Sequence, residues 1–244
     1  MYKDKLTIVM ATHFIPSAPD TRIIEETIRG METMPELDGC RCIIGYDMPA
    51  EQNQQHRAYY NNLKNIKCKY PIEVFIKINA QQRMNFMNVI RRVTTKYFLF
   101  MENDWLFIEP PNWNSLFNVM DNHEEVSTVY FNKRPNIIHK NEQYLIPVVI
   151  EDLPLLKTSK WSNNPYLART SKWFDEWLPA LLKAPLDRRE PLVQIENILH
   201  YKYLAEIATE GFEQVHSRWG MYSYGELNKN KMVLHLDGSE SGKS

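Results

Sequence analysis

The chain has 244 residues, of which 43% are hydrophobic, and its 29 Lys and Arg residues against 30 Asp and Glu residues give a formal net charge of −1. This composition allows a sizeable core and excludes a chain that is mainly disordered. The balanced charge argues against a protein that coats nucleic acid, because that binding needs a large basic excess. No stretch reaches the ~20 apolar residues of a membrane-spanning helix, so none is expected.

The cysteines are few and odd in number: Cys40, Cys42 and Cys68. They predict no disulfide framework and favour either a reducing compartment, the cytoplasm, or a domain that is indifferent to redox state. Cys40 and Cys42 lack a second cysteine pair, which argues against a structural zinc site. The chain has only 8 glycines, and neither a dinucleotide-binding fingerprint nor a P-loop is present. Residues 238–244 are expected to form a disordered tail.

Apolar runs alternate with amphipathic stretches through the first part of the chain. Strands are expected at 6–12, 42–46, 73–78 and 97–101. Helices are expected after the caps at 20–21, and at 51–64 and 80–94. This alternation predicts an α/β fold with a mostly parallel central sheet and helices on both faces.

The second part of the chain is less regular. Strands are expected at 126–131 and 144–150, and helices at 113–123, 171–182 and 193–208. No linker rich in Gly, Pro or Ser separates the two parts. The pattern therefore favours one domain over residues 1–237, with two halves that meet near residue 108.

Polar residues follow three of the predicted strands: Thr12 and His13, then Asp47, then the run from Glu102 to Asp104. Ligands bind at the carboxyl ends of strands in open parallel sheets. Glu102 and Asp104 point to the same side if the strand continues, and such a pair of carboxylates suits Mg²⁺ or Mn²⁺. A solvated turn is the alternative, but apolar runs on both sides favour a bound cation.

These features resemble the GT-A-fold nucleotide-sugar glycosyltransferases, in particular family-2-like members. The resemblance implies a Rossmann-type sandwich with a donor half at about 1–108 and an acceptor half at 109–237. Its D-x-D motif corresponds to Glu102-Asn103-Asp104, with Glu in place of the first Asp. The resemblance implies that Asp104, Glu102 and His216 bind Mn²⁺ or Mg²⁺, with residues 211–216 as the closing strand.

The resemblance also implies the remaining site residues. Those at the donor nucleotide are Thr12, His13, Asp47, Arg83 and Asn103. Those on the acceptor side are Trp161, Asn163 and Asn164, and residues 218–225 are expected to be a flexible segment that folds over the donor. The catalytic base is expected at Glu196, with Glu190 and Asp187 as alternatives. Two other interpretations remain open: Glu196 could be an acid that only stabilises the start of a helix, and His216 could be an ordinary histidine at a strand end.

The function expected from this resemblance is a metal-dependent, inverting transfer of a sugar from a UDP-sugar to a hydroxyl group on a glycan or glycoprotein. One alternative is a sugar-phosphate nucleotidyltransferase, which is disfavoured because residues 12–19 contain no glycine. Another is a non-catalytic carbohydrate-binding domain. The small size, scarce glycine and abundant asparagine resemble the compact glycosyltransferases of large DNA viruses, which implies viral glycosylation in the host cytoplasm.

Overall fold

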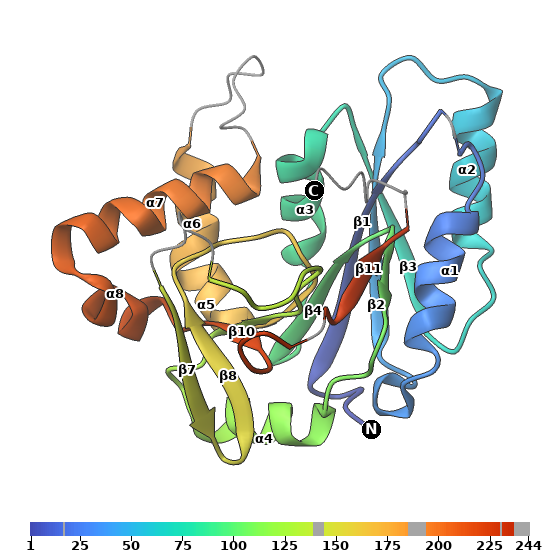
Figure 1. Ribbon diagram of the computed structural model, residues 1–244. Coiled ribbons are helices and arrows are strands. Elements are labelled where there is room, and N and C mark those ends of the chain that lie inside the picture. The colour runs from blue at the N-terminus through green and yellow to red at the C-terminus, as the bar shows by residue number, and fades with distance from the viewer. Residues whose placement is uncertain (17, 139–143, 185–193, 230, 237–244) are drawn as a thin grey trace. The chain divides into compact units, whose positions relative to one another are not determined.

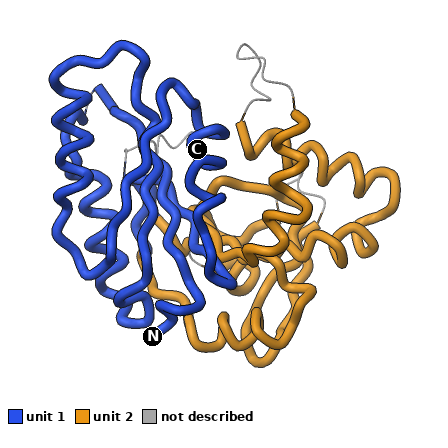
Figure 2. Tube along the Cα trace, turned by 180° about the vertical axis from the view of Figure 1, so that it is seen from behind, with its two compact units in different colours: residues 1–107, 234–244 blue, residues 108–233 orange. Residues whose placement is uncertain are grey.

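The computed structural model describes residues 1–236 except 17, 139–143, 185–193 and 230. The chain divides into two compact units (Figure 2): unit 1 comprises residues 1–107 and the segment from residue 234, and unit 2 comprises residues 108–233. The expected tail at 238–244 lies outside the described residues. The first unit boundary lies beside the division expected near residue 108.

Unit 1 contains four strands that are parallel throughout, in the order β3-β2-β1-β4. They are β1 (Leu6–His13), β2 (Arg41–Met48), β3 (Ile72–Ile78) and β4 (Tyr97–Glu102). Seven of the eight residues of β1 are buried, which requires cover on both faces of the sheet. The short strands β5 (Trp105–Phe107) and β11 (Val233–His235) form a separate pair.

The helices of unit 1 supply that cover: α1 (Arg22–Met31), α2 (Gln54–Lys64) and α3 (Gln81–Ile90), with a short 3-10 helix at Pro35–Leu37. Helices α1 and α2 lie on one face of the strands and α3 lies on the other (Figure 1). The predicted α/β architecture, with a mostly parallel sheet between helices, is therefore confirmed. Helix α2 begins at Gln54 rather than at 51 because Asn53 caps it.

Unit 2 contains strands in the order β9-β6-β10-β8-β7, of which β6 and β10 are parallel and the other pairs are antiparallel. The strands are β6 (Thr128–Tyr130), β7 (Leu145–Ile150), β8 (Leu153–Thr158), β9 (Tyr166–Arg169) and β10 (Met221–Tyr224). The helices are α4 (Trp113–Asn122), α5 (Thr170–Lys172), a π-helix (Trp173–Trp177), α6 (Leu178–Lys183), α7 (Ile195–Glu210) and α8 (Phe212–Trp219).

Two expectations for unit 2 were wrong. Residues 211–216 do not form a strand but begin α8, because Phe212, Val215 and Trp219 recur at helical spacing and are all buried. Residues 218–225 do not form a flexible segment, because Met221–Tyr224 is strand β10, hydrogen-bonded between β6 and β8.

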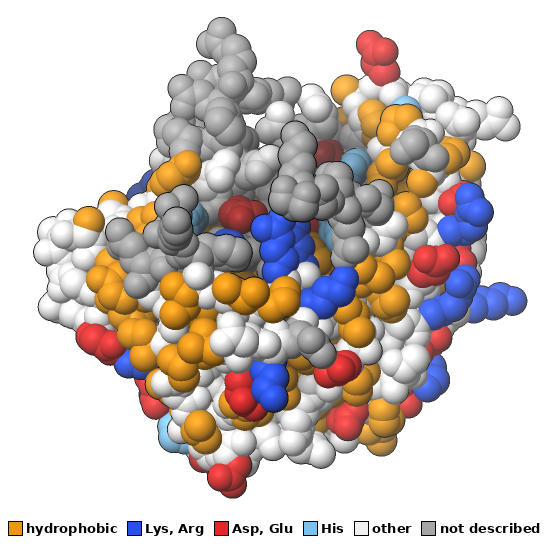
Figure 3. Space-filling view, in the orientation of Figure 1, with side chains coloured by type: hydrophobic (Ala, Val, Ile, Leu, Met, Phe, Trp, Pro, Cys, Tyr) orange, Lys and Arg blue, Asp and Glu red, His pale blue; other side chains and the backbone are white. Residues whose placement is uncertain are grey.

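The described surface carries mixed charge. Acidic and basic side chains are interspersed on the face shown in Figure 3, in keeping with the net charge of −1. No helix within the described ranges is both long enough and apolar enough to cross a membrane.

Candidate functional site

The carboxyl ends of β1, β2 and β4 meet at one edge of the unit 1 sheet. His13 lies opposite Asp47 in the β1–β2 register, and Ala11 lies opposite Glu102 in the β1–β4 register. The structure thus brings together polar residues that are far apart in the sequence. Parallel strand order dictates this, because each strand ends at the same side of the sheet.

Asp104 lies in the turn between β4 and β5 and contacts a histidine from the far end of the chain. Its Oδ2 is 3.1 Å from Nε2 of His235, and the two side chains are only 13% and 16% exposed. The Leu236 amide donates to the Asp104 carbonyl oxygen at 2.7 Å, and the Trp105 ring packs edge-on against the His235 ring at 4.5 Å between centroids. The contact is therefore held on both sides by backbone and ring packing.

Glu102 and Asn103 have different surroundings from Asp104. Gln82 Nε2 donates to Glu102 Oε1 at 2.6 Å, and burial, assisted by the Asp104 charge, raises the pKa of Glu102 to about 7. Asn103 is buried, and its carbonyl oxygen accepts a hydrogen bond of 2.9 Å from Thr27 of α1. Asn103 thus fixes the turn, while Gln82 fixes the acid that precedes it.

Asp104 of this turn and His235 of β11 could hold a divalent cation only if a substrate supplied further ligands. Within residues 1–236, apart from the ranges not described, no three His, Cys, Asp or Glu side chains converge on a metal position. Asp104 and His235 supply one carboxylate and one imidazole. Mg²⁺ is commonly held by one or two carboxylates together with substrate phosphates, and Mn²⁺ accepts similar oxygen ligands. This pair therefore suits a cation whose remaining ligands come from a diphosphate and water.

The other predicted donor residues of unit 1 lie at or beneath the same edge. Thr12 is buried, and its hydroxyl lies 2.8 Å from the Tyr59 hydroxyl, so its side chain supports the strand end. His13 is exposed. Asp47 Oδ1 accepts from the Ala80 amide at 2.7 Å, which fixes the start of α3. Arg83 is buried within α3, and this burial lowers its pKa.

Glu196, the expected base, lies in unit 2. It occupies the first turn of α7 and is half-buried. Its charge, after burial, contributes to raising the pKa of Tyr130. The alternatives Glu190 and Asp187 lie outside the described residues.

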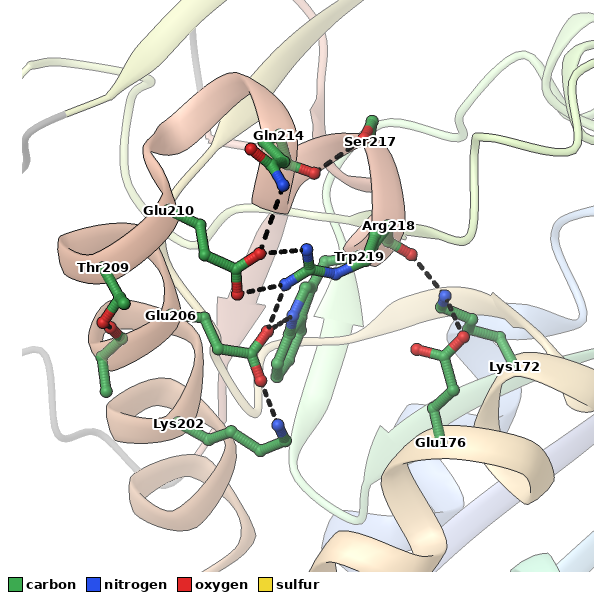
Figure 4. A network of polar contacts seen from close by, with 11 residues as sticks. Lys172, Glu176, Lys202, Glu206, Thr209, Glu210, Gln214, Ser217, Arg218 and Trp219 are labelled. Carbon is green, nitrogen blue, oxygen red and sulfur yellow. Dashed lines mark hydrogen bonds and ion pairs between the residues drawn. The ribbon is translucent and has the colours of Figure 1, made fainter.

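A polar network fixes α7 against α8 (Figure 4). Glu206 accepts from Trp219 Nε1 at 2.7 Å and from Arg218 at 3.2 Å, and it also pairs with Lys202. Arg218 in turn donates two hydrogen bonds to Glu210. A surface cavity of about 380 Å³ lies among these residues. Because its charged groups already bind one another, the network acts as a brace for the helix that carries Glu196.

Three acceptor-side residues lie in or beside the aromatic core of unit 2. Trp161 is fully buried and packs against Trp173 and Trp177 at 5.5 and 4.9 Å between ring centroids, so it presents no face to an acceptor sugar, contrary to expectation. Asn163 and Asn164 are half-buried in the loop before β9.

His216, the expected third metal ligand, also lies in the core. It is buried in α8, its Nε2 donates to the Met221 carbonyl oxygen at 2.8 Å, and burial lowers its pKa to about 4. The histidine beside Asp104 is His235, which sequence reasoning missed. The sequence did contain one indication of this strand: a short, mostly apolar run from Met232 to Leu236 within an otherwise polar end of the chain.

No family model matches the sequence, and no curated protein matches it significantly. Solved structures do. S. aureus TarS 1-349 in complex with UDP-GlcNAc matches with a TM-score of 0.53 and 10% identity over 96% of this chain and 61% of that one. The complex of the same protein with UDP matches with a TM-score of 0.51 and 11% identity over 94% and 59%. The fold is GT-A-like.

This GT-A-like chain spans about three fifths of the TarS 1-349 structures that it matches. CMP:2-keto-3-deoxy-manno-octonic acid synthetase complexed with CTP also matches, with a TM-score of 0.48 and 10% identity over 96% of this chain and 95% of that one. A structural similarity with so low a TM-score does not distinguish a glycosyltransferase from a nucleotidyltransferase. The comparisons establish the fold, as the sequence resemblance predicted.

Proposed function

We propose that this GT-A-like protein is a metal-dependent glycosyltransferase that transfers a sugar from a UDP-sugar to a hydroxyl group on a glycan or glycoprotein. The contact between Asp104 and His235, at the carboxyl edge of the parallel sheet, is the observation that carries this proposal. The choice of UDP is supported by the structural similarity to TarS, which binds UDP and UDP-GlcNAc.

Different residues of unit 1 would bind different parts of the donor. Asp104 and His235 would hold Mn²⁺ or Mg²⁺, which when bound supplies positive charge for the departing diphosphate. His13 and Asp47 lie where the nucleoside would bind, since they are paired at the carboxyl ends of β1 and β2. Arg83 keeps its positive charge at neutral pH and would pair with a phosphate.

The acceptor hydroxyl needs a base for an inverting reaction. Glu196 would take its proton as the oxygen attacks the anomeric carbon. Glu196→Gln should then lower kcat at least a hundredfold while the Kd for UDP stays unchanged. Equal kcat in the variant and the wild type would exclude Glu196 as the base.

The metal role is tested by thermal unfolding with UDP in the presence and absence of Mn²⁺. Ligand binding stabilises the folded state by about 2.7 kcal/mol at a hundredfold excess over Kd. The wild type should show an Mn²⁺-dependent shift, and Asp104→Ala should lose it. Asp4→Ala, an exposed acid at the opposite end of β1, should behave as the wild type. Equal shifts in wild type and Asp104→Ala would contradict the metal assignment.

Product analysis separates the alternatives. A glycosyltransferase releases UDP from a UDP-sugar, whereas a sugar-phosphate nucleotidyltransferase releases pyrophosphate from a nucleoside triphosphate. Slow Mn²⁺-dependent hydrolysis of a UDP-sugar without acceptor would argue against a carbohydrate-binding domain that has no activity. The three cysteines are free thiols, which supports the proposed cytoplasmic location.

A further inference from the structure

Thr12, the last buried residue of β1, is held from both faces of the unit 1 sheet. Its side-chain hydroxyl forms a hydrogen bond of 2.8 Å with the hydroxyl of Tyr59 in α2. Its carbonyl oxygen accepts a hydrogen bond of 3.3 Å from Nδ2 of Asn85 in α3. Helices α2 and α3 lie on opposite faces of these strands (Figure 1). The end of β1 is therefore fixed by its side chain on one face and by its backbone on the other.

Asn85 extends the same connection to β2. Its Nδ2 also donates to the Gly45 carbonyl oxygen at 2.9 Å, and Asn85 is only 2% exposed. This close approach requires a glycine in β2, because a Cβ on Gly45 would lie 2.7 Å from Asn85 Oδ1. A single side-chain amide thus joins the backbones of β1 and β2, within two residues of the ends where His13 lies opposite Asp47.

Tyr59 reaches the same two strand ends through its ring. The ring centroid lies 5.3 Å from that of Tyr46 in β2 and 5.9 Å from that of Phe14, which follows β1. Tyr59 and Thr12 are each only 2% exposed. A phenylalanine would pack the same ring without burying a polar group. What the Tyr59 hydroxyl adds is therefore its hydrogen bond to Thr12.

His13 follows Thr12 and is exposed at the edge where the nucleoside would bind. A strand end that moves freely must be ordered when a ligand binds, and this ordering lowers the affinity. Resting on the proposed function, we infer that Tyr59 and Asn85 are positioning residues, which act through Thr12 to hold the nucleoside site in its binding conformation. Their role is to order the site before the donor arrives.

Tyr59→Phe is the sharpest test, because it removes one hydroxyl and keeps the ring. Tyr60→Phe makes the same change at the next position of α2, which is half-buried, and is the matched control. Isothermal titration gives the Kd values for UDP and for inorganic pyrophosphate, each with Mn²⁺. Pyrophosphate offers phosphates to the cation but has no nucleoside. The comparison therefore separates an effect on the nucleoside site from an effect on the cation site.

Tyr59→Phe should raise the Kd for UDP about fivefold, the size of one hydrogen bond, and leave the Kd for pyrophosphate within twofold. Tyr60→Phe should change neither. Equal increases for both ligands would overturn the inference. A Kd for UDP within twofold of the wild type would also overturn it, and a lowered Tm would then show that the hydroxyl only stabilises the fold. Failure of the wild type to bind UDP with Mn²⁺ would instead reject the proposed function.

Hydrogen exchange tests the same positioning without a ligand, so its outcome does not depend on the proposed function. The amides of Thr12 and His13, followed by NMR, should exchange at least threefold faster in Tyr59→Phe and in Asn85→Ala, because the strand end opens more often. Asn88→Ala, which changes a half-buried asparagine on the same helix, should exchange as the wild type does. Unchanged exchange in both test variants would show that Tyr59 and Asn85 do not hold the end of β1, and would overturn the inference.

Discussion

His235 Nε2 lies 3.1 Å from Asp104 Oδ2, and this contact joins β11 to the turn that ends the parallel sheet of unit 1. Both side chains are mostly buried, although each is polar. Burial of such groups is costly unless they are paired. Under the proposed function this pair would hold a divalent cation together with a substrate, and it links β11, the last described strand, to the turn after β4.

Loss of the imidazole should weaken metal binding. We expect His235→Ala to raise the Kd for Mn²⁺ at least tenfold, as measured by electron paramagnetic resonance in the presence of UDP. Mutation of a residue that only hydrogen-bonds to a metal ligand already weakens metal binding by about 10–100-fold, so loss of a direct ligand should weaken it at least as much. His123→Ala in unit 2 is the matched control, since His123 pairs with Glu125 and Glu151 instead. A Kd within twofold of the wild type would show that His235 is not a ligand.

Two glycines next to α8 should differ in their response to alanine. A Cβ at Gly220, which has φ +61°, would lie 2.1 Å from the Glu125 carbonyl oxygen, whereas a Cβ at Gly211, with φ +87°, would meet nothing within 4 Å. Gly211→Ala should cost about 1–3 kcal/mol from backbone strain alone. Gly220→Ala should cost more than about 4 kcal/mol, by denaturant unfolding. The reverse order would contradict the close approach of Gly220 to the Glu125 carbonyl oxygen.

Stability should fall in mild acid because of His216. Burial lowers its folded-state pKa to about 4, while the unfolded value is about 6.5. Between these values the unfolded chain binds the extra proton, so the free energy of unfolding decreases as the pH falls, by about 3 kcal/mol at most. His216→Gln keeps a donor for the Met221 carbonyl and should reduce this loss between pH 6.5 and 4. If the free energy of unfolding depended on pH identically in the wild type and in His216→Gln, His216 would not be the cause of the acid loss.

The brace between α7 and α8 should depend on Glu206 more than on Glu210. Glu206→Ala leaves the Trp219 indole N–H without its acceptor and should lower the free energy of unfolding by about 1–3 kcal/mol. Glu210 is exposed and pairs only at the surface, so Glu210→Ala should cause a smaller loss. Chemical denaturation of both variants measures the difference, and equal losses would contradict a central role for Glu206.

The strands and helices of unit 1 were predictable because local pattern specifies them. The apolar runs of β1 and β4 and the polar residues that follow them are contiguous in sequence, so the edge with Thr12, Asp47 and Glu102 follows from strand order alone. Unit 2 was harder to predict, since β6, β9 and β10 have only three or four residues each and pair with strands that are distant in the sequence. The helical spacing of Phe212, Val215 and Trp219 was present in the sequence, but the family resemblance favoured a strand there.

The sequence by itself determined the α/β fold and the acidic turn at the end of β4, because both depend on residues that are neighbours in the chain. Only the tertiary structure decided which histidine meets Asp104. The choice of His235 over His216 depends on the pairing of β11 with β5 and on the burial of His216 in α8. Long-range strand pairing and burial are collective properties of the folded chain, and no short motif encodes them.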